Sequence, residues 1–445
     1  MRCINKNSNL ISFYKFTGLK KHFSILFFVY IAIVLFCNYT LGIFHLTDVE
    51  YHKSFDTYSY VDAAKLMLNG MKAHSLRCFG YAGFLAFPYT LFKLTPAFFW
   101  FVYIVQNILL VVSFQFIYKI IAFYSNDRKA FWAVLLLMIN ITYVVFAFHV
   151  MTEIGFLFFM VGSFYCIHLY FFKQQSAYLL VSFLAICIAT LFRPGMLYFN
   201  IIFGIILCLY FIVKKKNWLA FIFSGVIFFT IIGFQAYKMK QQYGLYKISF
   251  IDDVTMYRYL NTAIVAKLQG KDKLYLMGER DRLLFMKLEK MDADKVFKIN
   301  HEIVKNETSD LIKNHTFNFI LAFAENLVNN FHTGNTFIRD MPENKIINKE
   351  SRKRLFDYTR IWNMLFVVAM LLFNIFLLIK IFGKKIEVNS ATLLSFIILF
   401  YCDYCFITSG ISYFQGDRFN VIWMPMLLIS IMLFFSKKKI GSSSL

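Results

Sequence analysis

The sequence contains ten apolar stretches, each close to the roughly 20 residues that a helix needs to cross a bilayer. They lie near residues 23–44, 97–122, 130–148, 154–172, 177–192, 197–213, 218–236, 361–380, 389–408 and 419–436. Within a membrane, backbone polar groups must be paired inside helices or closed barrels, which narrows the choice of fold. We therefore predict an all-α polytopic membrane protein with about ten transmembrane helices, between about eight and twelve.

Composition excludes the other broad classes. The chain of 445 residues is 59% hydrophobic and only 16% charged, whereas ordinary globular domains carry about 25% charged residues. Intrinsic disorder requires low hydrophobicity and is excluded by the same values. The 8 cysteines are spread over a long chain, which argues against a small disulfide-rich scaffold.

The net charge of +22 is concentrated at alternate ends of the predicted spans. The clusters are Arg128, Lys129, Lys173, Lys214, Lys215, Lys216, Lys380, Lys384, Lys385, Lys437, Lys438 and Lys439. With the basic N-terminus inside, all of them are cytoplasmic, as the positive-inside rule requires. We interpret these residues as topology signals rather than as a nucleic-acid surface, and we expect both termini to be cytoplasmic.

This topology divides the chain into five parts. They are a cytoplasmic N-terminus (1–21), an N-terminal transmembrane module (22–236) with an outer loop (45–96), an extracytoplasmic helical region (237–359), a C-terminal transmembrane module (360–436) and a cytoplasmic tail (437–445). Within the extracytoplasmic region 237–359, Asn314–Phe331 has apolar residues at helical spacing but is too interrupted to span. It predicts an interfacial or re-entrant helix.

Charged residues also lie at the outer ends of several spans, where ionisable groups are costly and tend to be functional. Asp56 and Arg77 lie in the first outer loop, Glu153 and Arg193 lie at span ends, and Arg418 begins the last span. If the spans bundle, these residues converge on one outward-facing cavity. Arginine binds phosphate through its planar fork, and a carboxylate can accept a proton from an attacking hydroxyl.

Each of these residues alone has an ordinary explanation. Arg193-Pro194 can be a turn with a snorkelling arginine, and Glu153 can be a solvated helix start. Asp48, Glu50 and Asp62 are expected to be solvated loop residues. The order of the motifs along the chain is more informative than any single residue.

That order resembles the GT-C superfamily of polyprenyl-phosphate-sugar-dependent glycosyltransferases, in particular bacterial relatives of protein O-mannosyltransferases and of the lipid A aminoarabinose transferase. The matching motifs are Asp56-Thr57-Tyr58-Ser59-Tyr60, Arg77-Cys78-Phe79-Gly80-Tyr81, Thr152-Glu153, Arg193-Pro194 and Arg418-Phe419. The chain departs from the pattern in two places. Ala82 follows Tyr81 where a proline is usual, and Thr57 follows Asp56 where the best-known members have a second acid.

The resemblance implies a membrane glycosyltransferase that moves a hexosyl or pentosyl group from a polyprenyl-phosphate donor, with undecaprenyl phosphate as the expected carrier, to a glycan, lipid or protein acceptor. It implies Asp56 and Glu153 as the catalytic carboxylates, with Asp56 as general base. It also implies donor phosphate binding by Arg77, Arg193 and Arg418. The remaining candidates for lining the substrate cavity are Tyr58, Tyr60, Tyr81, His149 and Asp417.

No cluster of histidine, cysteine or aspartate has metal-ligand spacing, so we predict that no metal or other cofactor is required, with a divalent metal as the alternative. The resemblance places the protein in a bacterial inner membrane, surrounded by membrane lipids, with its active site facing the periplasm or exterior. It implies a role in envelope glycan, lipid or protein glycosylation.

Two other functions stay open. A surface-polysaccharide polymerase or ligase would also have many spans and a large outer loop with arginines. A lipid or solute transporter without chemistry would show broken spans near the midplane and related halves. The long first outer loop with its acid favours the glycosyltransferase.

Overall fold

The computed structural model describes residues 16–47, 55–214, 218–288, 293–341, 349–383, 390–413 and 415–436. These residues are folded into helices and connecting turns, and they include no β-strand. The predicted all-α class is therefore confirmed for this part of the chain. Asp48, Glu50 and the lysines at 215, 216, 384, 385 and 437–439 lie outside the described residues.

The helices follow one another with short connections. The first ten are α1 (Phe16–Leu41), α2 (Phe55–Leu68), α3 (Phe79–Phe92), α4 (Pro96–Tyr124), α5 (Asp127–Met138), α6 (Thr142–Ala147), α7 (Glu153–Lys173), α8 (Ser176–Phe192), α9 (Leu197–Lys214) and α10 (Trp218–Tyr243). The others are α11 (Ile251–Thr255), α12 (Thr262–Gln269), α13 (Lys273–Leu288), α14 (Ala293–Asn314), α15 (Thr316–Phe331), α16 (Thr336–Asp340), α17 (Lys349–Phe382), α18 (Ser390–Ser409) and α19 (Gly416–Phe434). Short 3-10 turns lie at Ile43–His45 and Pro194–Met196, and Met256–Asn261 forms a π-helix.

Seven of the described helices are long and apolar enough to cross a membrane. They lie at His22–Leu41, Pro96–Tyr124, Glu153–Lys173, Phe221–Tyr243, Lys349–Phe382, Ala391–Ser409 and Gly416–Phe434. Two shorter apolar helices, Ser176–Phe192 and Pro194–Leu207, cover two further predicted spans. The protein is thus a helical membrane protein, while the predicted total of about ten spans stays a prediction.

One predicted span is wrong as a continuous helix. The apolar run 130–148 is divided between α5 and α6, with a break around Asn140. The buried Asn140 side chain explains the break, because its Oδ1 accepts a hydrogen bond from the backbone N–H of Thr142 at 3.2 Å. An asparagine that bonds to the local backbone competes with the helical hydrogen bonds. The short helix α6 then leads the chain directly to His149 and Glu153.

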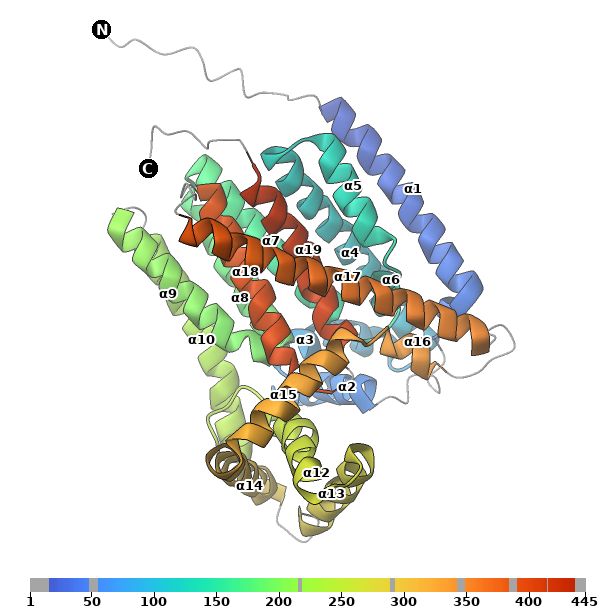
Figure 1. Ribbon diagram of the computed structural model, residues 1–445, viewed down its shortest axis with the longest axis vertical. Helices are drawn as coiled ribbons and strands as arrows, with labels where there is room; N and C mark the ends of the chain where they lie inside the picture. Colours follow the sequence, from blue (N-terminus) through green and yellow to red (C-terminus); the bar gives the residue numbers. More distant parts are fainter. Residues whose placement is uncertain are drawn as a thin grey trace.

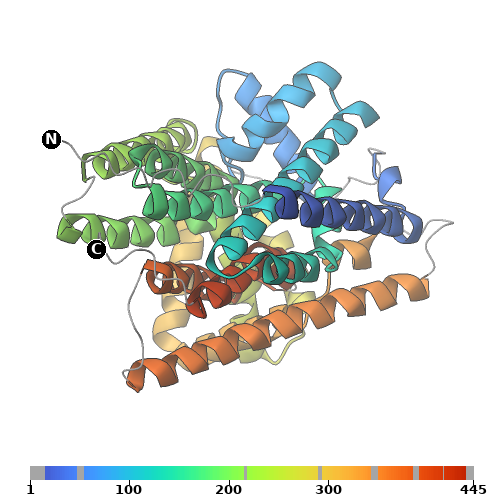
Figure 2. The same ribbon diagram turned by 90° about the horizontal axis from the view of Figure 1, so that it is seen from above.

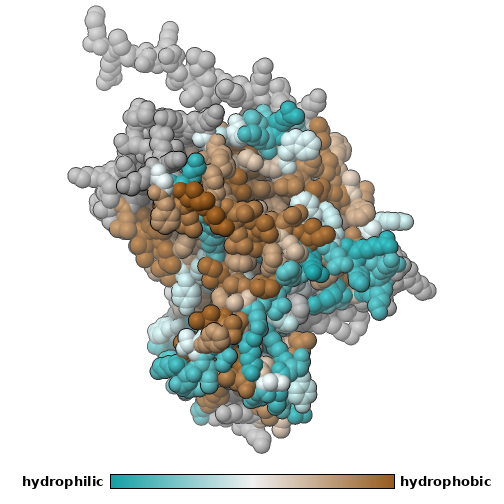
Figure 3. Space-filling view, viewed as in Figure 1, coloured by the Kyte–Doolittle hydropathy of each residue, from teal (hydrophilic) through white to brown (hydrophobic). Residues whose placement is uncertain are grey.

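The helices pack side by side in a bundle with two different ends (Figure 1). α1 begins and α19 ends at one end, where the α4–α5 turn and Lys173 also lie. At the other end lie the described parts of two long connecting segments, 43–47 with 55–95 and 244–288 with 293–341, and we call it the large-loop end. Seen from above, α17 runs along one side of the bundle (Figure 2). Hydrophobic side chains cover the bundle, and hydrophilic ones gather over the lower helices of the large-loop end (Figure 3).

Helix α15 confirms the predicted helix after Asn314, but its faces are unusual. Large apolar side chains are exposed on it, including Phe317 and Ile320. The residues that it buries are Ala322, Asn326 and Asn330. An exposed apolar face is typical of a helix at a membrane interface. The buried asparagines, in contrast, require polar partners in the bundle.

Close backbone approaches fix how the helix ends meet at the large-loop end. A Cβ atom added to Gly80, in the first turn of α3, would come within 2.7 Å of the backbone carbonyl carbon of Leu191 near the end of α8. Only glycine allows α3 to begin this close to α8. Arg77 and Arg193, which flank this contact in sequence, are thereby brought to the same region.

We expect Gly80→Ala to lower the free energy of unfolding by about 1–3 kcal/mol, because the added methyl group meets backbone rather than a mobile side chain. The matched control is Gly204→Ala in α9, where an added Cβ meets nothing within 4 Å. Thermal unfolding of the purified protein in detergent measures both variants. Equal melting temperatures for the two variants would contradict the proposed close contact.

Candidate active site

Asp56 lies in the first turn of α2, where the helix dipole favours a negative charge. Its Oδ1 forms an ion pair with Arg77, and its Oδ2 forms a second ion pair with Arg418 at 2.7 Å. The side chain of Asp56 is 27% exposed, more than the arginines beside it. The carboxylate is thus held at both oxygens and is still partly exposed.

Arg77 ends the turn between α2 and α3 and points back towards α2. Its Nε donates to the hydroxyl of Ser59 at 2.8 Å, and its Nη1 donates to the hydroxyl of Tyr60 at 3.1 Å. The guanidinium also lies 4.1 Å from the centre of the Tyr60 ring, a cation–π contact. Its donors are therefore shared between α2 side chains and the Asp56 carboxylate.

The backbone around Arg77 is held by the segment between α10 and α11. The backbone N–H of Phe250 donates to the carbonyl of Ser75, and the hydroxyl of Ser249 donates to the carbonyl of Leu76, both at 2.8 Å. The Cys78 thiol donates to the carbonyl of Ile248 at 3.1 Å. A loop from the second long segment thus fixes the position of a residue in the first.

Glu153 and Arg193 meet because α7 begins where α8 ends. Pro194 disfavours helical backbone at the preceding residue, and Arg193 accordingly ends α8 with φ −133° and ψ 94°. Gly155 allows the ring of Phe192 to approach the start of α7, since an added Cβ would lie 2.3 Å from the ring. The nearest nitrogen of Arg193 lies 3.9 Å from Glu153 Oε1 and also donates to the carbonyl of Arg418 at 2.9 Å.

Arg418, in the first turn of α19, connects the two carboxylates. Its Nη1 donates to Asp56 Oδ2 and its Nε donates to Glu153 Oε1, each at 2.7 Å. Asp56 and Glu153 are separated by almost one hundred residues, and Arg418 lies near the other end of the chain. The structure therefore brings together all five charged residues that the sequence singled out at the outer span ends.

We call the five residues Asp56, Arg77, Glu153, Arg193 and Arg418 the charged cluster, and their formal charges do not cancel. Three guanidinium groups (+3) and two carboxylates (−2) leave a formal charge of +1. The Glu153 side chain is fully buried, and its Oε2 has no hydrogen-bond partner among the described residues. A buried unsatisfied oxygen is costly, so an additional donor at this position would stabilise the site. A net positive cluster that is still partly exposed at Asp56 is suited to an anion.

The electrostatics of Asp56 follow from its neighbours. Burial raises the pKa of its carboxyl group, but the charges of Arg418 and Arg77 outweigh this effect and lower the pKa to about 2. A general base works best with a pKa near the working pH. Asp56 is therefore a weak base while both arginines hold it.

The aromatic candidates lie around the cluster. Tyr60 touches Arg77, and its ring meets that of Tyr81 edge to face with centroids 5.0 Å apart. Tyr81 donates to Gln106 Oε1 at 3.2 Å, so its hydroxyl faces the bundle interior. Tyr58 is half-buried on α2, two residues beyond Asp56.

The last two candidates face other parts of the structure. A ring nitrogen of His149 is hydrogen-bonded to the carbonyl of Val145 at 2.7 Å, and the ring lies against Phe337. Asp417 is fully buried and accepts from the backbone N–H of Thr336 at 3.1 Å, at the start of α16. Both side chains thus have hydrogen-bond partners other than the five charged residues.

Sequence reasoning missed three groups that hold the arginines. Ser59 accepts from Arg77, and Phe156 and Phe419 lie beside the guanidinium of Arg193 at 5.8 and 5.1 Å from their ring centres. The helical spacing of Asp56 and Ser59, three residues apart, was a usable signal. Phe419 belongs to the Arg418-Phe419 motif, whereas Phe156 had no signal, because the chain contains 57 phenylalanines.

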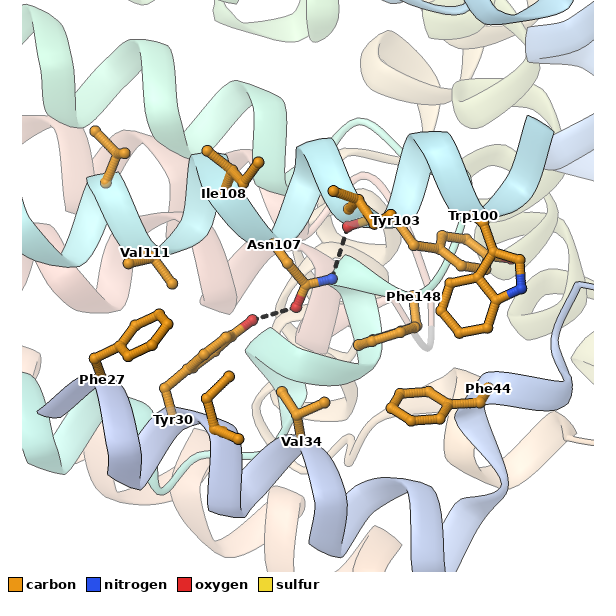
Figure 4. A pocket seen from close by; sticks show the side chains of 13 residues that line it. Phe27, Tyr30, Val34, Phe44, Trp100, Tyr103, Asn107, Ile108, Val111 and Phe148 are labelled. Atoms are coloured by element: carbon orange, nitrogen blue, oxygen red, sulfur yellow. Dashed lines mark hydrogen bonds between the residues drawn. The ribbon is translucent and has the colours of Figure 1, made fainter. Parts of the chain in front are cut away.

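A separate apolar cavity of about 360 Å³ lies between α1 and α4 (Figure 4). Its walls include Phe27, Val34 and Trp100, with the Tyr30–Asn107 hydrogen bond across it. None of the five charged residues lines it. The apolar walls suit hydrocarbon rather than phosphate, so we do not assign this cavity to the charged cluster.

The described residues include no group of three or more histidine, cysteine, aspartate or glutamate side chains that could hold a metal ion. The independence from metal that the sequence suggested stays a prediction.

Residues 84–236 match the model of the dolichyl-phosphate-mannose-protein mannosyltransferase family. The match covers about a third of the chain and includes Glu153 and Arg193, but it does not reach Asp56, Arg77 or Arg418. It confirms the resemblance to the GT-C superfamily. No curated protein sequence matches the chain.

Solved structures similar to this chain include the apo form of ArnT from Cupriavidus metallidurans, at 12% identity and a TM-score of 0.37, covering 94% of this chain and 78% of that one. The same protein bound to undecaprenyl phosphate is 13% identical, with a TM-score of 0.33 and coverage of 91% and 77%. An Archaeoglobus fulgidus oligosaccharyltransferase tethered to an acceptor peptide is 12% identical, with a TM-score of 0.44. The match covers 92% of this chain and 49% of the archaeal one, about half its length.

The low pKa of Asp56 predicts how its stabilising effect depends on pH. Its folded pKa of about 2 lies below the unfolded value of about 3.9. The stabilisation is therefore complete above about pH 4 and is lost as the pH falls towards 2. We expect Asp56→Asn to lower the melting temperature at pH 7, and the difference from the wild type to shrink between pH 5 and pH 3. A difference that does not change over this range would contradict the assigned ion pairs.

Proposed function

We propose that the protein is an integral membrane glycosyltransferase that moves a sugar from a polyprenyl-phosphate donor to an acceptor on the extracytoplasmic side. The observation that carries this proposal is the pairing of Asp56 with Arg77 and Arg418, next to the Glu153–Arg418 pair. It joins a potential base to phosphate-binding groups at one end of a bundle of membrane helices.

Charge supports a singly charged phosphodiester as the ligand. The five residues carry a formal charge of +1, and the phosphodiester that links a sugar to a polyprenol carries −1. Arginine presents donors in a planar fork that fits phosphate oxygens. A long isoprenoid tail keeps such a donor in the bilayer, and the cluster lies at the ends of helices long enough to cross one.

Donor binding would also prepare Asp56 for its role. Phosphate oxygens that engage Arg77 and Arg418 compete with the carboxylate for the same N–H groups. As these contacts weaken, the pKa of Asp56 rises from about 2 towards the range of a useful base. The base thus becomes active when the donor is in place.

The reaction step is a direct displacement. The acceptor hydroxyl or amine attacks the anomeric carbon, and its proton moves to Asp56 Oδ. The bond between the anomeric carbon and the phosphate oxygen breaks, and its electron pair stays on the departing polyprenyl phosphate. Arg77, Arg193 and Arg418 stabilise the added negative charge. Attack opposite the leaving group inverts the anomeric centre.

Several finer parts of the proposal have indirect support. The charged cluster lies at the large-loop end, whereas α7 ends, at Lys173, at the opposite end of the bundle (Figure 1). By the positive-inside rule, this arrangement supports an extracytoplasmic site. We further propose that the protein lies in a bacterial inner membrane and that undecaprenyl phosphate is the carrier. The transferred group is a hexosyl or pentosyl group, and the acceptor is a glycan, lipid or protein. We further propose that Asp56 and the arginines act without a metal.

We expect Asp56→Asn to reduce transfer at least about 100-fold, because the general base is lost, while binding of the donor is retained. Asp62→Asn is the matched control, since Asp62 lies on the same helix and pairs with Lys65 at the surface. The measurement is the consumption of radiolabelled polyprenyl-phosphate sugars by purified protein in detergent, with and without EDTA.

Loss of transfer in Asp56→Asn with near wild-type transfer in Asp62→Asn supports the assignment. Absence of both binding and consumption for every lipid-phosphate sugar with the wild-type protein would refute the proposed function. Loss of wild-type transfer in EDTA would refute only the metal-independent step.

Phosphate binding is tested separately. We expect Arg193→Ala to weaken binding of undecaprenyl phosphate about 10-fold or more, because a charged hydrogen bond contributes about 1.5–3 kcal/mol. The control is Arg282→Ala on α13, an exposed arginine at the same end of the protein. Equal dissociation constants for the two variants would remove Arg193 from the phosphate site.

A further inference from the structure

The buried face of α15 contains amides that contact the turn before α19. Asn330 is 2% exposed, and its Nδ2 donates to the carbonyl of Ser409 at 2.7 Å. Its Oδ1 accepts from the backbone N–H of Gln415 at 3.0 Å. One side chain therefore joins the end of α18 to the residue that precedes α19, across the whole intervening turn.

The same turn is in direct contact with the α15 backbone. A Cβ atom added to Gly416, the first residue of α19, would lie 1.8 Å from the carbonyl oxygen of Asn330. No other amino acid fits at this position without moving one of the two helices. Gly416 is two residues before Arg418, so the approach of α15 fixes the start of the helix that carries this arginine.

A second contact holds the other side of the same helix start. Asp417 accepts from the backbone N–H and hydroxyl of Thr336, which begins α16. Arg418 itself points the other way, towards Asp56 and Glu153. Gly416 and Asp417 thus contact α15 and α16, while the side chain of Arg418 pairs with Asp56 and Glu153.

We propose that Asn330 is a positioning residue that sets the location of Arg418 in the charged cluster. The inference rests on the proposed function for its catalytic meaning, but the positioning itself is independent of any activity. Both polar groups of the buried Asn330 side chain are hydrogen-bonded to the segment between the end of α18 and the start of α19. Small displacements of a catalytic group can cost about 100-fold in rate.

The direct test is chemical labelling of Arg418. Purified protein is treated with phenylglyoxal, which reacts with accessible guanidinium groups, and the labelled peptides are followed over time by mass spectrometry. Arg418 is 14% exposed and paired in the wild type. We expect Asn330→Leu to increase its labelling rate about 3–10-fold, because the turn before α19 is released.

Two matched controls separate positioning from general loosening. Asn329→Leu changes the adjacent asparagine, which is only half-buried, and should leave labelling of Arg418 unchanged. Arg280, in the large-loop segment, is 13% exposed and paired with Glu307, and its labelling should be the same in all variants. If Asn330→Leu does not fold, Asn330→Ser removes the same amide and should change labelling in the same direction.

The second readout is the pH dependence of transfer. In the wild type the pKa of Asp56 is about 2, so Asp56 gives no acid limb above about pH 4. With Arg418 displaced, only Arg77 opposes the effect of burial on Asp56, so its pKa should rise and an acid limb in kcat/KM should appear at higher pH than in the wild type. Asn329→Leu should show the wild-type profile.

Unchanged labelling of Arg418 in a folded Asn330 variant overturns the positioning role, whatever the activity. Increased labelling of Arg418 in Asn330→Leu, found together with a wild-type protein that neither binds nor consumes any donor, supports the positioning and refutes the proposed function. Increased labelling equal at Arg418 and Arg280 indicates general loosening and also overturns the inference.

Discussion

The fully buried carboxylate of Glu153 is the constraint on which the arrangement of this end of the protein depends. Removing a carboxylate from water is expensive, and breaking a buried pair by removing one partner is strongly destabilising. Arg418 compensates the charge directly at 2.7 Å, and Arg193 lies 3.9 Å from the same oxygen. The starts of α7 and α19 and the end of α8 must therefore meet. This requirement explains why three segments so far apart in sequence share one site.

The apolar surfaces of the helices cannot set this geometry alone. Between membrane helices there is little hydrophobic driving force, because lipid tails are as apolar as leucine side chains. Close packing and polar contacts must decide how the helix ends align. Gly80 and Gly416 allow backbones to touch, and Asn330 and Asp417 hold the start of α19. Specific alignment thus comes from a few small and polar residues among many interchangeable apolar ones.

The difference between interchangeable apolar residues and specific polar or small ones also decides which parts of the fold could be predicted from the sequence. Apolar length predicts a membrane helix whatever its neighbours are, which is why most of the predicted spans coincide with described helices. Charges at span ends are costly enough to require one another, so the meeting of Asp56, Glu153, Arg193 and Arg418 was foreseeable. The break at Asn140 was not, because asparagine within an apolar run is compatible with either a continuous or an interrupted helix. The environment of Asp417 was not foreseeable either, since adjacent residues on a helix face different neighbours.

With its ion pairs formed, the charged cluster is not suited to the proposed reaction. Asp56 is held by two arginines and has a pKa far below the working range, while Glu153 Oε2 has no partner among the described residues. Both features are explained if, before the donor binds, the ion pairs hold the arginines at the positions where they would bind a phosphate. In the proposed mechanism, an arriving phosphodiester takes over N–H groups from Asp56 and balances the remaining positive charge. The carboxylate then becomes a stronger base only when the sugar that it serves is present. In this proposal, charge balance between protein and donor couples binding to activation, and the placement of Arg418 between the two carboxylates makes the exchange possible.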